Sequence, residues 1–183
     1  MLVRQKIQGA RLNSLRITRI FLLVLFVVSI LTGCNVYKFN QTTIDPEIKT
    51  VRVQYIENNA RYKNPQLSPQ LTDKLRQKIV SQTKLTQVNS DDADFDISGA
   101  VTQYDVSTSG ISNQQVSTNR LTVGVSLVLL NRKKPGEQPR NISASRSFDF
   151  SASLTLTEAE RRLNDEIIRN LTDEIFNKLF SDW

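Results

Sequence analysis

Few residues of this 183-residue chain could take part in catalysis, because the sequence contains no histidine and a single cysteine. The lack of histidine excludes Ser-His-Asp and Cys-His catalysis, imidazole-bearing zinc sites and the usual general base near neutral pH. An enzyme would have to depend on carboxylates and lysines. Apart from the acidic segment at residues 92–96, no motif in the sequence supplies a pair of carboxylates for hydrolysis. The six glycines are dispersed and form no phosphate-binding loop. We therefore expect a protein that is not an enzyme and that needs no cofactor.

An acidic segment, Asp92-Ala-Asp94-Phe-Asp96, has acids at the first, third and fifth positions, as a calcium-binding loop does. Such a loop also needs glycine at position six and glutamate at position twelve, where this chain has Ile97 and Gln103. The pattern therefore favours carboxylates that solvate a turn before a strand. No metal site is predicted.

A basic cluster is the set of side chains best suited to bind a ligand. Arg132, Lys133 and Lys134 begin a loop that contains Pro-Gly, and Arg140 ends it. Four cations at a hairpin tip could hold anionic phosphates, arginine through two hydrogen bonds and lysine as a point charge. The alternative is a solvated turn kept soluble by its charge. Arg146 shares the apolar parity of its strand, so it either extends to solvent or meets a carboxylate or a ligand.

Four segments alternate between apolar and polar residues with the period of β-strands. The second changes parity around Gly99, which indicates a bulge. The last two flank the Pro-Gly loop and predict an antiparallel hairpin. Residues 107–115 are expected to form a polar loop, and residues 85–88 a short extended segment. The strands are expected at residues 50–56, 95–106, 120–129 and 142–150.

Two amphipathic helices are expected. In the first, Ser68 is a candidate cap, Pro69 suits the first helical position, and the apolar stripe runs to about Gln82. In the second, Thr157-Glu-Ala-Glu160 fits a capping box, and apolar residues then recur every four positions through Leu179. The order β-α-β-β-β-α predicts an α+β fold, with both helices on one face of a roughly four-stranded, mainly antiparallel sheet.

The cysteine, Cys34, follows a segment with the parts of a secretory signal peptide. Five cations and no acid precede an apolar run, residues 21–30. Counted from Ile20 to Leu31, the apolar stretch is about twelve residues long, whereas a membrane-spanning helix needs roughly 20. A chance cysteine after a cleaved signal is the other alternative. Leu31-Thr-Gly-Cys34 resembles the lipobox of bacterial lipoproteins, and we expect Cys34 to be lipidated and to become the first residue of the mature chain.

Removing the signal peptide changes the charge balance. The whole chain has 24 cations and 18 acids, and residues 1–33 hold five of the cations, so the mature chain has 24 − 5 = 19 cations against 18 acids. Nucleic-acid binding therefore loses its main support. Without a second cysteine, the fold must be stabilised by burial rather than by a disulfide. We expect a cleaved signal peptide at 1–33, a lipidated tether at 34–49 and one domain at 50–183.

Several stretches together resemble the LptE-like family of lipopolysaccharide-assembly lipoproteins. The resemblance covers most of the mature chain and depends on the order and spacing of its parts. These are Gly33-Cys34-Asn-Val-Tyr37-Lys-Phe39, Val51-Arg-Val-Gln-Tyr55 with Asn58-Asn59-Ala60, Leu71-Thr-Asp-Lys-Leu75 running to Gln82-Thr83-Lys-Leu85, Asn119-Arg120-Leu-Thr-Val123, and Ile175-Phe176-Asn-Lys178 with the terminal Trp183.

The resemblance implies two helices packed on a four-stranded sheet, and a domain that sits inside an outer-membrane β-barrel of the LptD type. There it would plug the lumen, assist barrel assembly and help lipopolysaccharide to cross to the outer leaflet. Basic residues at one tip would contact lipopolysaccharide phosphates, and charge alone suggests Arg132, Lys133, Lys134 and Arg140 for this role. Asn35 is not the aspartate that retains lipoproteins in the inner membrane, so we expect an outer-membrane anchor that faces the periplasm.

Two other classes of protein remain as alternatives. One is a lipoprotein binding module of another envelope assembly system, such as a pilotin, because layered α+β folds host many functions. The other is a periplasmic hydrolase, which would need a carboxylate pair in a cleft. The partner that co-purifies with the protein would distinguish the first alternative from a translocon subunit.

Overall fold

The computed structural model describes residue 19, residues 44–112 and residues 115–180. The chain divides into two units, Met1–Asn40 and Gln41–Trp183, and eight strands and helices belong to the second. They are β1 (Thr50–Val53), β2 (Glu57–Asn58), α2 (Leu67–Gln82), β3 (Thr86–Gln87), β4 (Phe95–Ser112), β5 (Gln115–Asn131), β6 (Arg140–Ser151) and α3 (Leu156–Phe180). No helix in the described ranges is both long enough and apolar enough to cross a membrane.

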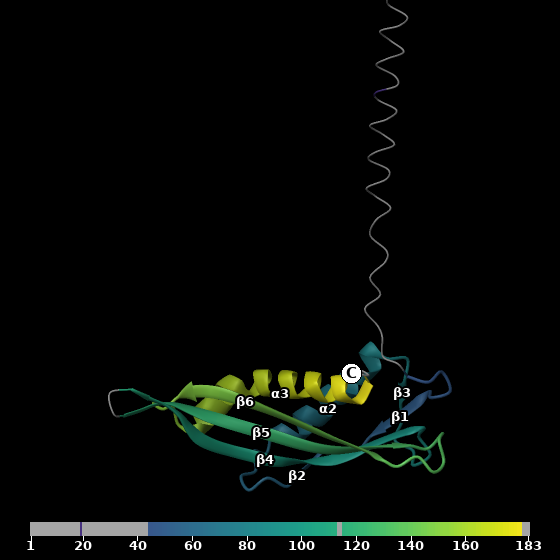
Figure 1. Ribbon diagram of the computed structural model, residues 1–183, viewed down its shortest axis with the longest axis horizontal. Coiled ribbons are helices and arrows are strands. Elements are labelled where there is room, and N and C mark those ends of the chain that lie inside the picture. The colour runs from purple at the N-terminus through teal and green to yellow at the C-terminus, as the bar shows by residue number, and fades with distance from the viewer. Residues whose placement is uncertain (1–18, 20–43, 113–114, 181–183) are drawn as a thin grey trace, which may run out of the picture. The chain divides into compact units, whose positions relative to one another are not determined.

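The six strands form one mixed sheet in the order β3-β1-β4-β5-β6, with β2 also paired to β4. The β4–β5 and β5–β6 pairs are antiparallel, whereas β1 pairs in parallel with both β3 and β4. Both helices lie on one side of this sheet and pack against each other (Figure 1). The predicted α+β class is confirmed. The sheet has more strands than predicted because β2 and β3 have two residues each, too few for an alternating pattern.

The core lies between the helices and the sheet. Leu71, Leu75 and Ile79 of α2 and Leu171 and Ile175 of α3 have no exposed surface. They cover alternate residues of the long strands, among them Ile97, Val101, Leu121, Val123 and Leu127, which are also fully buried. The predicted apolar stripes of both helices are therefore confirmed. A four-residue spacing places these residues on one face of the helix, which packs on the sheet.

Both helices begin at other residues than the capping patterns predict. Ser68 does not cap α2: the residue before the helix is Gln66, and the buried Ser68 hydroxyl has no hydrogen-bond partner. In α3 the capping box is formed by Thr155 rather than Thr157. The Glu158 amide donates to Thr155 Oγ1 at 3.3 Å, and the Thr155 amide donates to Glu158 Oε2 at 2.9 Å. Two overlapping Thr-x-x-Glu frames make this choice ambiguous locally.

The long β4–β5 hairpin also differs from the prediction. The parity change that is expected near Gly99 occurs at Thr102, an extra residue between the pairs Val101↔Val125 and Gln103↔Gly124. The expected loop at 107–115 is strand up to Ser112 and again from Gln115. Residues 107–110 are small and polar, and Ile111, the next residue, is 73% exposed. Without a buried apolar residue at every second position, residues 107–111 show no strand pattern.

Candidate functional site

The four cations predicted to form a basic tip lie at the β5–β6 connection. Arg132, Lys133 and Lys134 follow the last residue of β5, and Arg140 is the first residue of β6. The predicted hairpin is confirmed by the pairing of β5 with β6 from Leu129↔Arg140 to Thr118↔Ser151. Gly136 in the turn has a φ of 91°, a conformation that glycine adopts without strain.

Asp96 connects the basic loop to the sheet. Its carboxylate accepts hydrogen bonds from Arg52 Nε at 3.0 Å and Arg52 Nη2 at 2.6 Å, and from Gln54 Nε2 at 3.0 Å. Arg132 Nη2 contacts the same carboxylate at 3.2 Å, while Arg52 also pairs with Asp91. Burial would raise the pKa of Asp96, but the hydrogen bonds and the charge of Arg52 hold it below its usual value.

Asp94 makes a similar connection between the start of β1 and the basic loop. Its Oδ2 accepts the backbone amides of Lys49 at 2.8 Å and Thr50 at 3.0 Å, and its Oδ1 lies 3.2 Å from Lys133 Nζ. These bonds, with the Lys49 amide contributing most, lower the pKa of Asp94 to about 2. Asp94 therefore remains ionised and links the entry to β1 with the basic loop.

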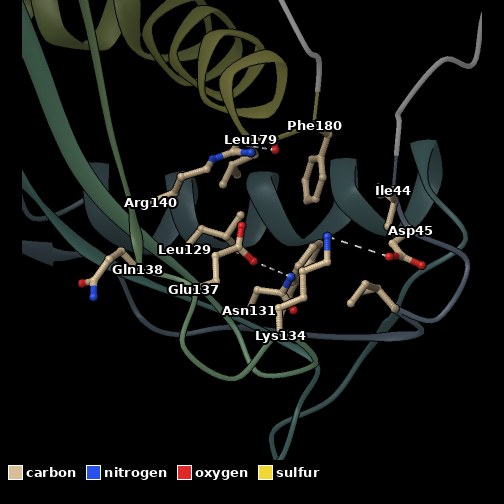
Figure 2. Close-up of a pocket in the computed structure, with 12 residues that line it drawn as sticks. Ile44, Asp45, Leu129, Asn131, Lys134, Glu137, Gln138, Arg140, Leu179 and Phe180 are labelled. Atoms are coloured by element: carbon tan, nitrogen blue, oxygen red, sulfur yellow. Dashed lines mark hydrogen bonds and ion pairs between the residues drawn. The ribbon is translucent and has the colours of Figure 1, made fainter.

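The other two cations contact the two ends of the folded domain. Lys134 Nζ lies 3.9 Å from Asp45 Oδ2, a contact drawn in Figure 2. Arg140 Nη2 donates to the carbonyl oxygens of Lys178 at 2.9 Å and Leu179 at 2.8 Å. These carbonyls belong to the last turn of α3, where a cation is favoured by the helix dipole. Arg140 therefore caps the C-terminal end of α3.

A pocket of about 150 Å³ opens between these contacts. Its wall combines apolar side chains from the core with polar side chains from the loop (Figure 2). The apolar members are Ile44, Ile48, Phe95, Leu129, Leu179 and Phe180, and the polar members are Asp45, Asn131, Lys134, Glu137, Gln138 and Arg140. The site therefore has an apolar floor and a charged rim.

The electrostatic character of this end differs from that of a bare basic tip. Four cations, Arg52, Arg132, Lys133 and Lys134, form ion pairs with four acids, Asp45, Asp91, Asp94 and Asp96. The side chains of Lys133 and Lys134 are nevertheless 48% and 57% exposed. An anion could reach these two ammonium groups from solvent, in competition with their carboxylate partners.

The prediction that the acids of residues 92–96 solvate a turn is wrong for Asp94 and Asp96, which are buried and paired with cations. The sequence pattern does not reveal the pairing of Asp96 with Arg52 and Arg132. These partners are 36 to 44 residues from Asp96 in the sequence, so no local pattern pairs them. The presence of several acids and several cations in these segments is the one available indication. In the described part of the chain, no group of three or more Asp, Glu, His or Cys side chains is placed to hold a metal ion. Cys34, the predicted lipidation site, lies outside the described residues.

Arg146 has a distinct position on the helix side of β6. Its Nε lies 2.6 Å from Glu174 Oε2 on α3, and Lys178 Nζ lies 2.9 Å from Glu174 Oε1. Of the outcomes considered for Arg146, the structure shows contact with a carboxylate. The pair joins β6 to α3 and takes no part in the basic loop.

The fold and this site define an α+β domain with helices on one side of a mixed sheet and a charged loop beside a partly apolar pocket. The family model described as LptE, lipopolysaccharide-assembly, matches residues 48–179. The chain therefore belongs to the LptE lipopolysaccharide-assembly family, and the resemblance expected from the sequence is confirmed. The match begins at the buried Ile48 and ends at Leu179, so it includes every strand and almost all of α3.

Solved structures with a similar chain path have low sequence identity. Rare lipoprotein B from Shewanella oneidensis is 14% identical, with 70% of this chain and 90% of that chain covered and a TM-score of 0.45. An uncharacterized lipoprotein B from Nitrosomonas europaea is 16% identical, with 68% and 75% covered and a TM-score of 0.42. PelC from Paraburkholderia phytofirmans is 15% identical, with 74% and 88% covered and a TM-score of 0.43. No curated protein sequence matches the chain significantly.

Proposed function

We propose that this protein is a non-enzymatic lipoprotein subunit of the lipopolysaccharide translocon, which plugs a barrel of the LptD type and assists its assembly. The observation that supports this best is the family match over residues 48–179, because it spans nearly the whole folded domain. The absence of histidine from the sequence supports a binding role rather than catalysis.

The uncovered face of the sheet suits a plug in a wide barrel, whose lumen is polar. Exposed serines of β6 lie on this face, at positions 143, 145 and 147, opposite Ser126, Gly124 and Thr122 of β5. Such small hydroxyl side chains can exchange hydrogen bonds with a polar wall at low desolvation cost. This face carries mainly uncharged polar groups along the middle of β6.

The proposed location is the periplasmic side of the outer membrane. The signal-like segment, the Leu-Thr-Gly-Cys34 sequence and Asn35 support this location. Acyl chains on Cys34 would anchor the domain stably if several are attached, since a single chain binds a membrane only marginally. The anchor would then hold the domain near the membrane, while the folded part selects its partner.

Direct contact with lipopolysaccharide phosphates is proposed for Lys133, Lys134, Arg132 and Arg140. The two lysines are the most accessible, and the 3.9 Å separation of Lys134 from Asp45 is the longest of the ion pairs at this end. A phosphate has a higher charge than a carboxylate and could replace it at a lysine ammonium group. Arg132 and Arg140 also position the loop, through Asp96 and the end of α3, so their contacts with phosphate would be secondary to those of the lysines.

The principal experiment is purification of the tagged full-length lipoprotein from detergent-solubilised envelopes. A barrel of the LptD type should co-purify in stoichiometric amount, and depletion of the lipoprotein should reduce the amount of assembled barrel. Cys34→Ser provides a matched variant that tests whether acylation is needed for this association. Recovery of another envelope assembly protein, without the barrel, would instead support the pilotin-like alternative.

Lipopolysaccharide binding is tested separately with charge-reversed lysines. Lys133→Glu combined with Lys134→Glu should weaken binding about tenfold or more in low salt, and the difference should shrink as ionic strength rises. Lys74→Glu, on the exposed side of α2, changes charge at a distant site and serves as the control. Equal binding by the tip variant and the control would refute the phosphate contacts while leaving the barrel association intact.

A further inference from the structure

The strand β4 has a long free edge. β1 pairs with β4 at residues 95–97 and β2 pairs with it at residues 100–101, both in parallel. Beyond Val101, no described segment pairs with this side of β4, although the strand continues to Ser112. Residues 103–111 are therefore bonded to β5 on one side only. They leave main-chain groups available for another strand.

The pairing pattern identifies which backbone groups face this edge. Gln54 donates its amide to the Ile97 carbonyl, and Asn59 donates its amide to the Val101 carbonyl, so these two carbonyls point away from β5. The extra residue at Thr102 shifts the alternation by one. The outward set therefore continues at Tyr104, Val106 and Thr108.

The opposite edge of the sheet, along β6, has charged side chains at its middle. Lys178 Nζ donates to the carbonyl oxygen of Ser143 at 2.5 Å, and Arg146 is paired with Glu174 beside this strand. Charged side chains near an edge are a common means of preventing unwanted strand pairing. By contrast, Asp105 is the only charged residue in the free part of β4. The contrast between a cation bound at the β6 edge and the nearly uncharged free part of β4 is the first sign of a docking site.

A pocket beside the free edge is the second sign. It has a volume of about 390 Å³ and is lined by Arg61, Tyr62, Tyr104, Asp105, Val106 and Leu156. The Tyr62 and Tyr104 rings are 5.4 Å apart, and Tyr104 Oη donates to Glu160 at 2.7 Å, which holds the inner wall in place. Tyr62 and Val106 remain 42% and 43% exposed, and Ile111 further along the same strand is 73% exposed.

We propose that the free edge of β4, residues 103–111, binds an extended segment of the barrel partner by β-strand addition, with an apolar side chain of that segment in the Tyr62–Val106 pocket. Strand addition takes its affinity from main-chain hydrogen bonds and its specificity from pockets for alternate side chains. This inference rests on the proposed function, because it names the surface through which the partner is held.

The chemistry of the edge defines its occupant. A row of amide and carbonyl groups at the regular spacing of a strand edge is matched best by another extended polypeptide backbone, rather than by a lipid or a sugar. The pocket between Tyr62 and Val106 suits an aliphatic or aromatic side chain, and the single acid along the edge favours a partner segment with little negative charge. A second copy of this chain would present the same acid, so we assign the edge to a different chain.

Photo-crosslinking in the full-length, membrane-anchored protein tests the assignment. A benzophenone amino acid is placed at Ser107, beside the free edge, or at Lys74, an exposed residue of α2. The expected result is a crosslink from position 107 to the co-purified barrel, mapped to one short segment, with at least a fivefold lower yield from position 74. Equal yields from both positions would overturn the assignment.

Proline substitutions test the main-chain bonds directly. Val106→Pro removes an edge-facing amide and should leave the β4–β5 ladder intact, since proline is tolerated where the N–H points away from the sheet. It should reduce barrel recovery about tenfold, as expected for loss of main-chain bonds. Val106→Thr keeps the amide and should reduce recovery less. Asn141→Pro, which removes an outward amide on β6 before the row of serines, is the matched control.

Several results would contradict the inference. If the barrel co-purifies normally with Val106→Pro, or is lost to the same extent with the β6 control, strand addition at β4 is refuted while the proposed function stands. If no barrel co-purifies with the unmodified protein, both fail. A crosslink from position 107 to a second copy of this chain would also refute it. Thermal unfolding of each variant shows whether a loss of recovery reflects loss of the edge or of the fold.

Discussion

Arg52 and Asp96 occupy directly opposite positions of the parallel strands β1 and β4, and they form a two-point ion pair with separations of 3.0 and 2.6 Å. The pair also receives Arg132 from the β5–β6 loop. Three segments that are distant in the sequence therefore meet at one carboxylate. This carboxylate determines where the basic loop lies relative to the sheet.

The loss of this carboxylate is expected to destabilise the domain. Asp96→Asn should lower the free energy of unfolding by about 2 kcal/mol, because charged hydrogen bonds are lost and the guanidinium of Arg52 is left partly buried. Asp92→Asn is the control, since Asp92 is exposed and contacts Ser90. Urea unfolding at pH 7 measures both. Equal stability of the two variants would contradict a structural role for Asp96.

Acid sensitivity is expected from Asp94. Its folded-state pKa of about 2 lies below the ordinary value of 3.8, so protonation favours the unfolded chain. The stabilisation should be complete above about pH 5 and should be lost as the pH falls toward about 2. Asp94→Asn should flatten the dependence of the melting temperature on pH in this window. Asp96 and Asp149, whose pKa values are also lowered, should maintain a residual slope.

Lys133→Met tests the cause of that acid sensitivity. Because the Lys49 amide contributes most to the lowered pKa of Asp94, this variant should retain most of the wild-type pH dependence. The melting temperature measured from pH 2 to 5 checks it. A profile as flat as that of Asp94→Asn would show instead that the lysine charge dominates.

Gly99 and Gly136 offer a comparison between crowding and backbone strain. A Cβ at Gly99 would lie 2.7 Å from the Leu127 Cα, and φ is 153°, so Gly99→Ala should cost about 3 kcal/mol. Gly136 has a φ of 91°, but a Cβ added there would have nothing within 4 Å, so Gly136→Ala should cost only about 1 kcal/mol. Thermal and urea unfolding would measure the difference. A larger loss at Gly136 would contradict the close approach of β4 and β5.

The start of α3 is tested by two threonines. Thr155→Ala should lower the free energy of unfolding by about 1 kcal/mol, because Thr155 Oγ1 accepts the Glu158 amide and bonds the Glu158 carboxylate. Thr157→Ala, inside the first turn, should change it by less than about 0.5 kcal/mol. Chemical denaturation of both variants checks the order. The reverse order of effects would restore the capping box expected from Thr157 and Glu160.

The start of α2 illustrates why local patterns place helix boundaries poorly. Ser68 and Pro69 are suitable residues for a helix start, yet α2 begins at Leu67 because Asn64 already turns the chain. Its side-chain Oδ1 accepts the Gln66 amide at 2.9 Å, and its Nδ2 donates to Glu160 on α3. The contact with α3 is a tertiary one, so no pattern within residues 64–69 could reveal it.

The α+β class, both helices, the β5–β6 hairpin and the likeness to the lipopolysaccharide-assembly family could all be predicted from the order of residues. The helices and strands can be predicted from periodicity. An apolar residue at every second position buries one face of a strand, and one at every fourth position buries one face of a helix. The intramolecular partners of the four predicted cations could not be predicted, nor could the free edge of β4 and the cation bound at the edge of β6. Both depend on strand order and register, which bring Arg52 to Asp96 and Lys178 to Ser143 across 35 or more residues.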